Sequence, residues 1–208
     1  RLRDSYAQRR PCATTRQERT ADRWNRTRRL HPVFQDKRSK SRESVNYKKL
    51  NNVFGWAVFA IATITYFMTI EPTTSFWDCG EYIATSVKLQ VGHPPGAPFF
   101  QLMGNLFGQF AANPESQALM VNALSALSSS FSILFLFWTI TALGVKLLGG
   151  QDKLDNASTI AVLGAGAVGA LAYTFSDSFW FSAVEGEVYA MSSFFSSRCA
   201  AVTTRRAA

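Results

Sequence analysis

Three long stretches without a charged side chain dominate the hydrophobic pattern of this sequence. They cover residues 53–70, 118–145 and 158–176. An α-helix needs about 20 mostly apolar residues to cross the hydrocarbon of a bilayer, and each stretch approaches or exceeds that length. The pattern therefore predicts an all-α integral membrane protein with about three transmembrane helices. A soluble protein with long buried helices is the alternative.

The segment between the first two stretches, residues 71–116, predicts a loop that contains short helices. Its residues 99–110 combine apolar and polar positions in the manner of an amphipathic helix lying in the membrane interface. Asn113 and Pro114 close the loop, and a capping Asn followed by Pro at the first helical position is a typical helix start. The loop is therefore expected to carry interfacial amphipathic helices.

Charge is distributed very unevenly along the chain. Residues 1–49 carry 16 Lys and Arg against 5 Asp and Glu, whereas residues 50–197 carry 3 Lys against 9 acidic residues. The net charge of +8 therefore arises at the ends and does not indicate a nucleic-acid partner. Residues 1–46 have too few apolar side chains to bury a core. They predict a disordered basic segment that could be non-native, with a targeting peptide or an RNA-binding arm as alternatives. Residues 198–208 predict a non-native or disordered tail.

Flanking charge also predicts the orientation of the protein in its membrane. The basic segment precedes the first stretch, and Lys146 and Lys153 lie between the second and the third. Because Lys and Arg collect in cytoplasmic loops, the N-terminus and residues 146–157 are expected in the cytoplasm. Loop 71–116 and the segment after residue 176 then share the outer face.

Two acidic residues in the outer loop are candidates for chemistry. Asp78 and Glu81 lie three residues apart in a segment expected to be helical from Ser75 to about Gln90, so both carboxylates would share one helix face. Such a pair can bind a cation or supply a general base. In the alternative interpretation, Ser75 and Asp78 form a capping box, and the Asp78 carboxylate only satisfies a backbone N–H.

Two further polar features follow the acidic pair. His93 lies in a rigid turn from Gly92 to Pro98, in which prolines fix the backbone and glycines allow it to bend. Its imidazole could donate to a phosphate or a sugar hydroxyl, or simply bond to a loop carbonyl. Glu185 and Glu187 lie in a largely apolar segment, and acids in such places are functional candidates. The alternative is that they pair with cations elsewhere in the protein.

The sequence Gly-Ala-Gly-Ala-Val-Gly at residues 164–169 has two interpretations. It matches the G-x-G-x-x-G pattern of a dinucleotide-binding turn, which would require a strand ending at Leu163 and a soluble NAD-dependent enzyme. Small residues at this spacing also let membrane helices pack closely. A short polar loop and two predicted spans precede the motif, which favours helix packing.

Three motifs together resemble a known family. They are EPTTSFWDCGEY at residues 71–82, GHPPGAPFFQL at 92–102 and FWFSAVEGEVYAM at 179–191. From Tyr47 to Phe195 the chain resembles a family of bacterial multispanning proteins that was catalogued as a domain of unknown function. That family is related to protein O-mannosyltransferases, in the type-C glycosyltransferase superfamily.

The resemblance implies a site on the outer face. Asp78 would be the catalytic base for the acceptor hydroxyl, and Glu81 would support or orient it. His93 would lie near the phosphate of the donor, Glu187 would line the same outer cavity, and Lys88 is expected among the substrate-binding residues. No metal ligand is assigned, and a requirement for a divalent metal is left open.

The resemblance also implies a substrate, a location and a larger parent protein. The donor would be a polyprenyl-phosphate sugar and the acceptor a protein hydroxyl, on the periplasmic side of a bacterial inner membrane. The chain would then be an N-terminal fragment of a multi-pass enzyme, inactive by itself. The alternative is a non-catalytic membrane protein, either a transporter subunit or an assembly scaffold.

Overall fold

The computed structural model describes residues 46–94 and 96–206, and this described part consists of helices, turns and loops without a strand. Three helical segments are long and apolar enough to cross a membrane, which confirms the predicted fold class. They are α2 (Tyr47–Met68), the segment Pro114–Leu147 and α6 (Asn156–Thr174). The predicted basic segment lies outside the described residues, except for Asn46, which caps α2.

Apart from α8 (Val188–Arg206), the elements outside the three candidate spans are short. The segment Pro114–Leu147 combines a 3₁₀ turn, η1 (Pro114–Ser116), with the 31-residue helix α5 (Gln117–Leu147). The other helices are α3 (Cys79–Lys88), α4 (Pro98–Gly108), η2 (Gln151–Lys153), α7 (Asp177–Val184) and the longer α8 (Val188–Arg206). The amphipathic helix expected at residues 99–110 therefore exists as α4.

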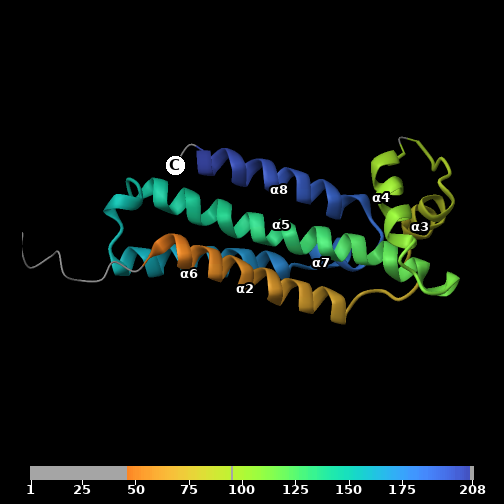
Figure 1. Ribbon diagram of the computed structural model, residues 1–208, viewed down its shortest axis with the longest axis horizontal. Helices are drawn as coiled ribbons and strands as arrows, with labels where there is room; N and C mark the ends of the chain where they lie inside the picture. Colours follow the sequence, from red (N-terminus) through yellow and green to blue (C-terminus); the bar gives the residue numbers. More distant parts are fainter. Residues whose placement is uncertain (1–45, 95, 207–208) are drawn as a thin grey trace, which may run out of the picture. The chain divides into compact units, whose positions relative to one another are not determined.

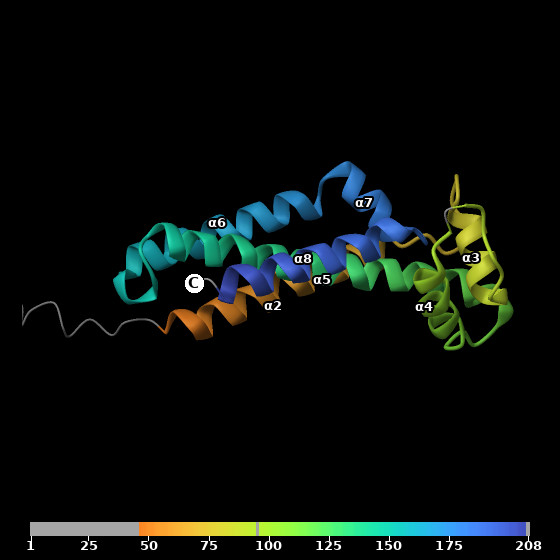
Figure 2. The same ribbon diagram turned by 90° about the horizontal axis from the view of Figure 1, so that it is seen from above.

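Helix α5 is the centre of the bundle, with α2, α6 and α8 packed along it (Figures 1 and 2). In its most apolar window, 67% of the residues are buried, against 22% in α2 and 33% in α6. The largest side chains that α5 buries completely include Phe137, Ile133 and Leu134. Because α2 and α6 keep apolar outer faces, those faces suit lipid or further helices.

The glycines of α6 serve packing and not dinucleotide binding. Residues 164–169 lie inside α6, so the strand that a dinucleotide-binding turn requires is absent here. A Cβ on Gly166 would lie 2.6 Å from Thr141 Cγ2 and 3.0 Å from the Phe137 ring, whereas one on Gly164 would meet nothing within 4 Å. Gly166 is therefore the point of closest approach between α6 and α5.

The last turns of the described chain are helical. Residues 198–206 continue α8, so the alternative that the tail 198–208 is disordered is wrong as far as Arg206, whereas the alternative that it is non-native stays a prediction. Ala201 of this segment is 3% exposed, and the Arg205 guanidinium lies 4.1 Å from the centre of the Trp138 ring. The change in composition misled the prediction because alanines still form helix and pack, and because Arg can lie flat on an aromatic ring.

One end of the bundle gathers the loop 71–116 and the turn between α7 and α8, as the sequence predicted for these parts. The prediction that the whole segment after residue 176 lies at this end is wrong for α8, which runs back along α5. Helices α3 and α4 lie at this end (Figure 1). The backbone N–H of Glu71 donates to the Val184 carbonyl over 3.1 Å. The buried Asn122 of α5 donates from Nδ2 to the carbonyls of Glu71 and Thr73 at 2.7 and 3.0 Å. These bonds fix the loop onto the end of α5.

Candidate active site

The start of α3 holds both acidic candidates. The helix begins at Cys79, later than the predicted Ser75, and Asp78 is its N-cap residue. The Asp78 side chain makes no capping hydrogen bond, so the interpretation of this carboxylate as a helix cap is wrong. Trp77, immediately before it, has a φ of 62°, a left-handed conformation that few non-glycine residues adopt. This turn leaves the Asp78 carboxylate 56% exposed and available for chemistry.

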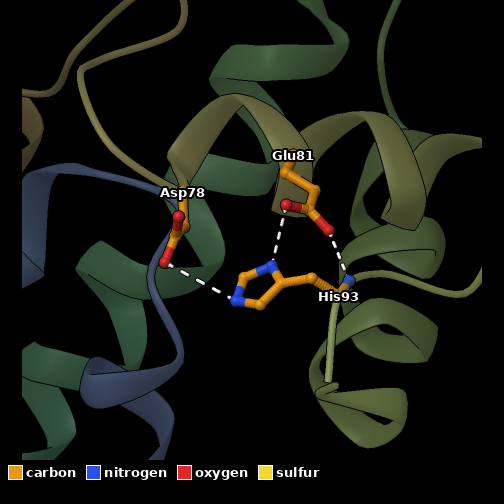
Figure 3. Close-up of side chains that lie close together, drawn as sticks. All are labelled: Asp78, Glu81 and His93. Atoms are coloured by element: carbon orange, nitrogen blue, oxygen red, sulfur yellow. Dashed lines mark hydrogen bonds and ion pairs between the residues drawn. The ribbon is translucent and has the colours of Figure 1, made fainter. Parts of the chain in front are cut away.

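Glu81 and His93 are joined by two hydrogen bonds across twelve residues of sequence (Figure 3). The backbone N–H of His93 donates to Glu81 Oε1 at 2.6 Å, and His93 Nδ1 lies 2.8 Å from Glu81 Oε2. A Cβ on Gly92 would lie 2.9 Å from Glu81 Oε1, so a glycine is required for this close approach. On the other side of the imidazole, Nε2 faces Asp78 Oδ2 at 4.0 Å.

The pKa values of Glu81 and His93 move in opposite directions because the two groups stabilise each other's charged form. The backbone N–H of His93, and then its side chain, lower the pKa of Glu81. The hydrogen bond to Glu81, followed by the charges of Glu81 and Asp78, raises the pKa of His93. The ion pair is therefore complete between the ordinary values of 4.5 and 6.5. Its contribution is lost as the pH falls through the Glu81 pKa or rises through the His93 pKa.

Replacing Glu81 by Gln is expected to lower the pKa of His93 towards its ordinary value, because the main groups that hold the proton are removed. A ¹H–¹³C NMR titration of histidine-labelled chain in nanodiscs measures this shift. The control is Glu115→Gln, which removes the same charge from η1, where no contact with His93 is found in the described chain. An unchanged His93 titration in Glu81→Gln would contradict the pairing.

The three side chains could also hold a metal ion. Asp78, Glu81 and His93 each offer one ligand atom, and these atoms lie within 4.8 Å of one another. Carboxylate and imidazole ligands suit several divalent cations. No metal ligand was predicted from the sequence, so these three residues are the set with which a metal requirement can be tested.

Asp78 also lines a cavity of about 430 Å³ between the loop before α3, helix α7 and the start of α8. The carboxylates of Glu185 and Glu187 reach it from the turn between α7 and α8. Burial, together with the charges of Asp78 and Glu185, raises the pKa of Glu187. A carboxyl group of this kind keeps its proton to higher pH than an exposed one and can donate a hydrogen bond.

Aromatic side chains form much of the rest of this cavity. Trp77, Tyr82 and Tyr189 line it beside the carboxylates. These aromatic residues were not predicted as site residues, although each lies within two residues of an acidic candidate in the FWDCGEY and EGEVY motifs. That mixture of aromatic and acidic residues was the available signal.

The structure brings together four of the five predicted site residues. Asp78, Glu81 and His93 form one cluster, and Glu187 shares the cavity with Asp78. Lys88 lies in the last turn of α3, exposed and outside the cavity. Lys88 is the last of the ten residues of α3, so it lies roughly 13 Å along the axis from Cys79 at the start of the helix. A role of Lys88 in substrate binding therefore stays a prediction without support from this arrangement.

Comparison with known proteins gives two relatives of the same description. The chain is 29% identical over 139 residues to the protein O-mannosyl-transferase tmem260 of Dictyostelium discoideum, covering 66% of this chain and 15% of that protein. It is 29% identical over 155 residues to the protein O-mannosyl-transferase TMEM260 of Mus musculus, covering 72% of this chain and 19% of that protein. The chain thus spans less than a fifth of the length of these curated relatives. No solved structure matches it.

A family model adds the decisive match, because it covers more than half of the chain. It is described as the protein O-mannosyl-transferase TMEM260 N-terminal domain, and it matches residues 78–206. The matched region begins at Asp78 and includes Glu81, His93 and Glu187. The relation to O-mannosyltransferases that the three motifs indicated is confirmed, and the chain belongs to the family of the TMEM260 N-terminal domain.

Proposed function

We propose that the full-length protein containing this chain is a membrane glycosyltransferase that moves a sugar from a polyprenyl-phosphate donor to a protein hydroxyl. The sugar is mannose, by likeness to the names of its relatives. The reaction takes place at the α3–α4 end of the bundle. On the orientation predicted from the flanking charges this is the outer side, which is the periplasmic side of a bacterial inner membrane.

One observation carries the proposal: Asp78 belongs both to the cluster with Glu81 and His93 and to the acid-lined cavity. The cavity has the size and lining that a hexose requires. Its carboxylates can bind sugar hydroxyls, and its aromatic rings offer flat apolar surfaces to the face of a pyranose. A base at the edge of such a cavity would meet both the sugar and an incoming hydroxyl.

The proposed step is a single displacement. The acceptor oxygen attacks the anomeric carbon, its proton passes to the Asp78 carboxylate, and the bond between the anomeric carbon and the phosphate oxygen breaks. The polyprenyl phosphate leaves with the electron pair of that bond. Protonated His93, held by Glu81, lies beside Asp78 and is suited to attract the negative phosphate.

The position of the acids favours an enzyme over a transporter. A transporter commonly places charged groups near the midplane, in broken helices. None of the three candidate spans carries an acid in its apolar part, and α5 has Lys146 only in its last turn. All the acids of the candidate site lie at one end of the bundle, where a membrane-surface reaction would need them.

Direct transfer tests the proposal. The full-length protein, reconstituted in liposomes, is incubated with polyprenyl-phosphate [³H]mannose and a serine- and threonine-rich acceptor protein. We expect radiolabel on the acceptor that β-elimination releases, as an O-linked sugar does. If a correctly inserted protein transfers no sugar from polyprenyl-phosphate mannose or from other polyprenyl-phosphate hexoses, the transporter or scaffold alternative is favoured.

A further inference from the structure

A second cavity lies at the opposite end of the bundle from Asp78. It has a volume of about 430 Å³ and is formed by the start of α2, the last turns of α5, η2 and the end of α8. In Figure 1 these helix ends lie together, away from α3 and α4. Six of its lining residues are polar, charged or aromatic groups suited to binding a ligand: Lys48, Asn51, Trp138, Thr141, Gln151 and Arg205. We call it the Lys48 cavity.

The Lys48 cavity carries two positive charges, those of Lys48 and Arg205, and no acidic residue of the described chain lines it. Asp152 lies in the adjoining hollow, but within the described chain neither cation forms an ion pair with a carboxylate. Two cations facing one partly enclosed space favour an anionic ligand.

The setting of Arg205 leaves its donors available. Its guanidinium carbon lies 4.1 Å from the centre of the Trp138 ring, in a cation–π contact that requires none of its N–H donors. The N–H groups point outward in the plane of the guanidinium, where they match the oxygens of a phosphate. Trp138 thus orients Arg205 without consuming its hydrogen-bond donors.

Asn51 adds a requirement for a donor on the ligand. Its Oδ1 is buried and has no hydrogen-bond partner in the described chain. A buried acceptor without a partner is costly, and a ligand hydroxyl would satisfy it after a small rotation of the Asn51 side chain, which lines the cavity. Gln151 and Thr141 supply further polar groups around the same space.

The position of the Lys48 cavity along the bundle indicates the chemical class of its ligand. The cavity lies where the apolar part of α2 begins and the apolar part of α5 ends, beside the connection to α6. Lys, Arg and Trp at such helix ends lie at the level of lipid head groups. The geometry points to a binding site for a phosphate ester that carries a hydroxyl group, and a glycerophospholipid head group is the source that this depth favours. This site is separate from the proposed transfer reaction and does not depend on it.

Binding of phosphatidylglycerol to the 208-residue chain tests the site. Native mass spectrometry of the chain in neutral detergent gives the affinity for this lipid in wild type and in Lys48→Gln and Arg205→Gln. Each variant is expected to bind about fivefold more weakly, since one basic group near a membrane surface contributes on the order of 1 kcal/mol. Lys146→Gln is the matched control, because Lys146 lies at the same end of α5 and outside the cavity.

The outcomes distinguish a specific binding site from nonspecific attraction between basic residues and anionic lipid. Loss in Lys48→Gln and Arg205→Gln with retention in Lys146→Gln supports the site. Equal loss in all three variants, or no loss in any, overturns it. Lys48 is exposed, so its variant also answers the question if Arg205→Gln fails to fold.

Two further ligands test whether the natural ligand is a lipid head group or a free phosphate ester, and whether Asn51 contributes to its binding. Glycerol 1-phosphate, a soluble phosphate ester, should bind far more weakly than the lipid if the head group is the natural ligand, and equal binding would assign the site to a free phosphate ester. Phosphatidylmethanol has the same charge without the head-group hydroxyl. It should bind more weakly than phosphatidylglycerol in wild type and equally in Asn51→Leu; a preference that survives in Asn51→Leu would remove Asn51 from the site.

Discussion

Replacing Asp78 by Asn is expected to lower sugar transfer by the full-length protein by about 10²–10⁴-fold, the usual contribution of a general base. Asn keeps the size and polarity of the side chain but cannot accept the proton of the acceptor hydroxyl. The measurement is the initial rate of [³H]mannose transfer in liposomes. Because the Asp78 side chain caps no helix and is 56% exposed, the substitution should leave folding intact.

Asp177→Asn is the matched control for this experiment. Asp177 is an exposed acid at the first position of α7, near the same end of the bundle, and it does not line the cavity of Asp78. It should retain transfer within a few-fold of wild type. If Asp78→Asn inserts normally and still transfers at the wild-type rate, Asp78 is not the base, and Glu187 becomes the first carboxylate to replace.

The large-scale fold could be predicted because it depends on composition over long windows. Helices α2, α5 and α6 begin and end within a few residues of the limits expected, apart from the start of α2. That helix extends back to Tyr47 because polar residues continue a helix readily when Asn46 caps it. The wrong prediction at residues 198–206 has the same origin, since composition does not report the packing of α8 on α5.

The candidate site was predictable only in part, because its geometry depends on contacts across the loop. The spacing of Asp78 and Glu81 indicated a shared helix face. It could not indicate that Glu81 accepts from the backbone and side chain of His93, a contact that Gly92 permits. Nor could it show that the Asp78 side chain makes no capping hydrogen bond and that Asp78 lines a cavity with α7 and the start of α8, because these contacts are far apart in the sequence.

Replacing Gly166 by Ala is expected to destabilise the bundle by about 1–3 kcal/mol, the typical cost of an added methyl group in a tightly packed interior. The new Cβ would lie 2.6 Å from Thr141 Cγ2 and 3.0 Å from the Phe137 ring, and both distances are shorter than ordinary van der Waals contact. Both neighbours are completely buried and cannot move aside cheaply. Membrane helices associate mainly through such close packing, so the loss falls directly on the contact between α6 and α5.

Gly164→Ala supplies the comparison, because it makes the same chemical change two residues earlier in the same helix. Nothing lies within 4 Å of its new Cβ, so only helix propensity changes, and Ala is favoured over Gly by up to about 1 kcal/mol. Thermal unfolding of the 208-residue chain, followed by circular dichroism in detergent, should give a lower Tm for Gly166→Ala and an equal or higher one for Gly164→Ala. Equal shifts in both variants would mean that Gly166 is not the point where α6 meets α5. A lower Tm for Gly166→Ala alone would show that the glycine-rich motif serves helix packing, the role that distinguishes this chain from a dinucleotide-binding protein.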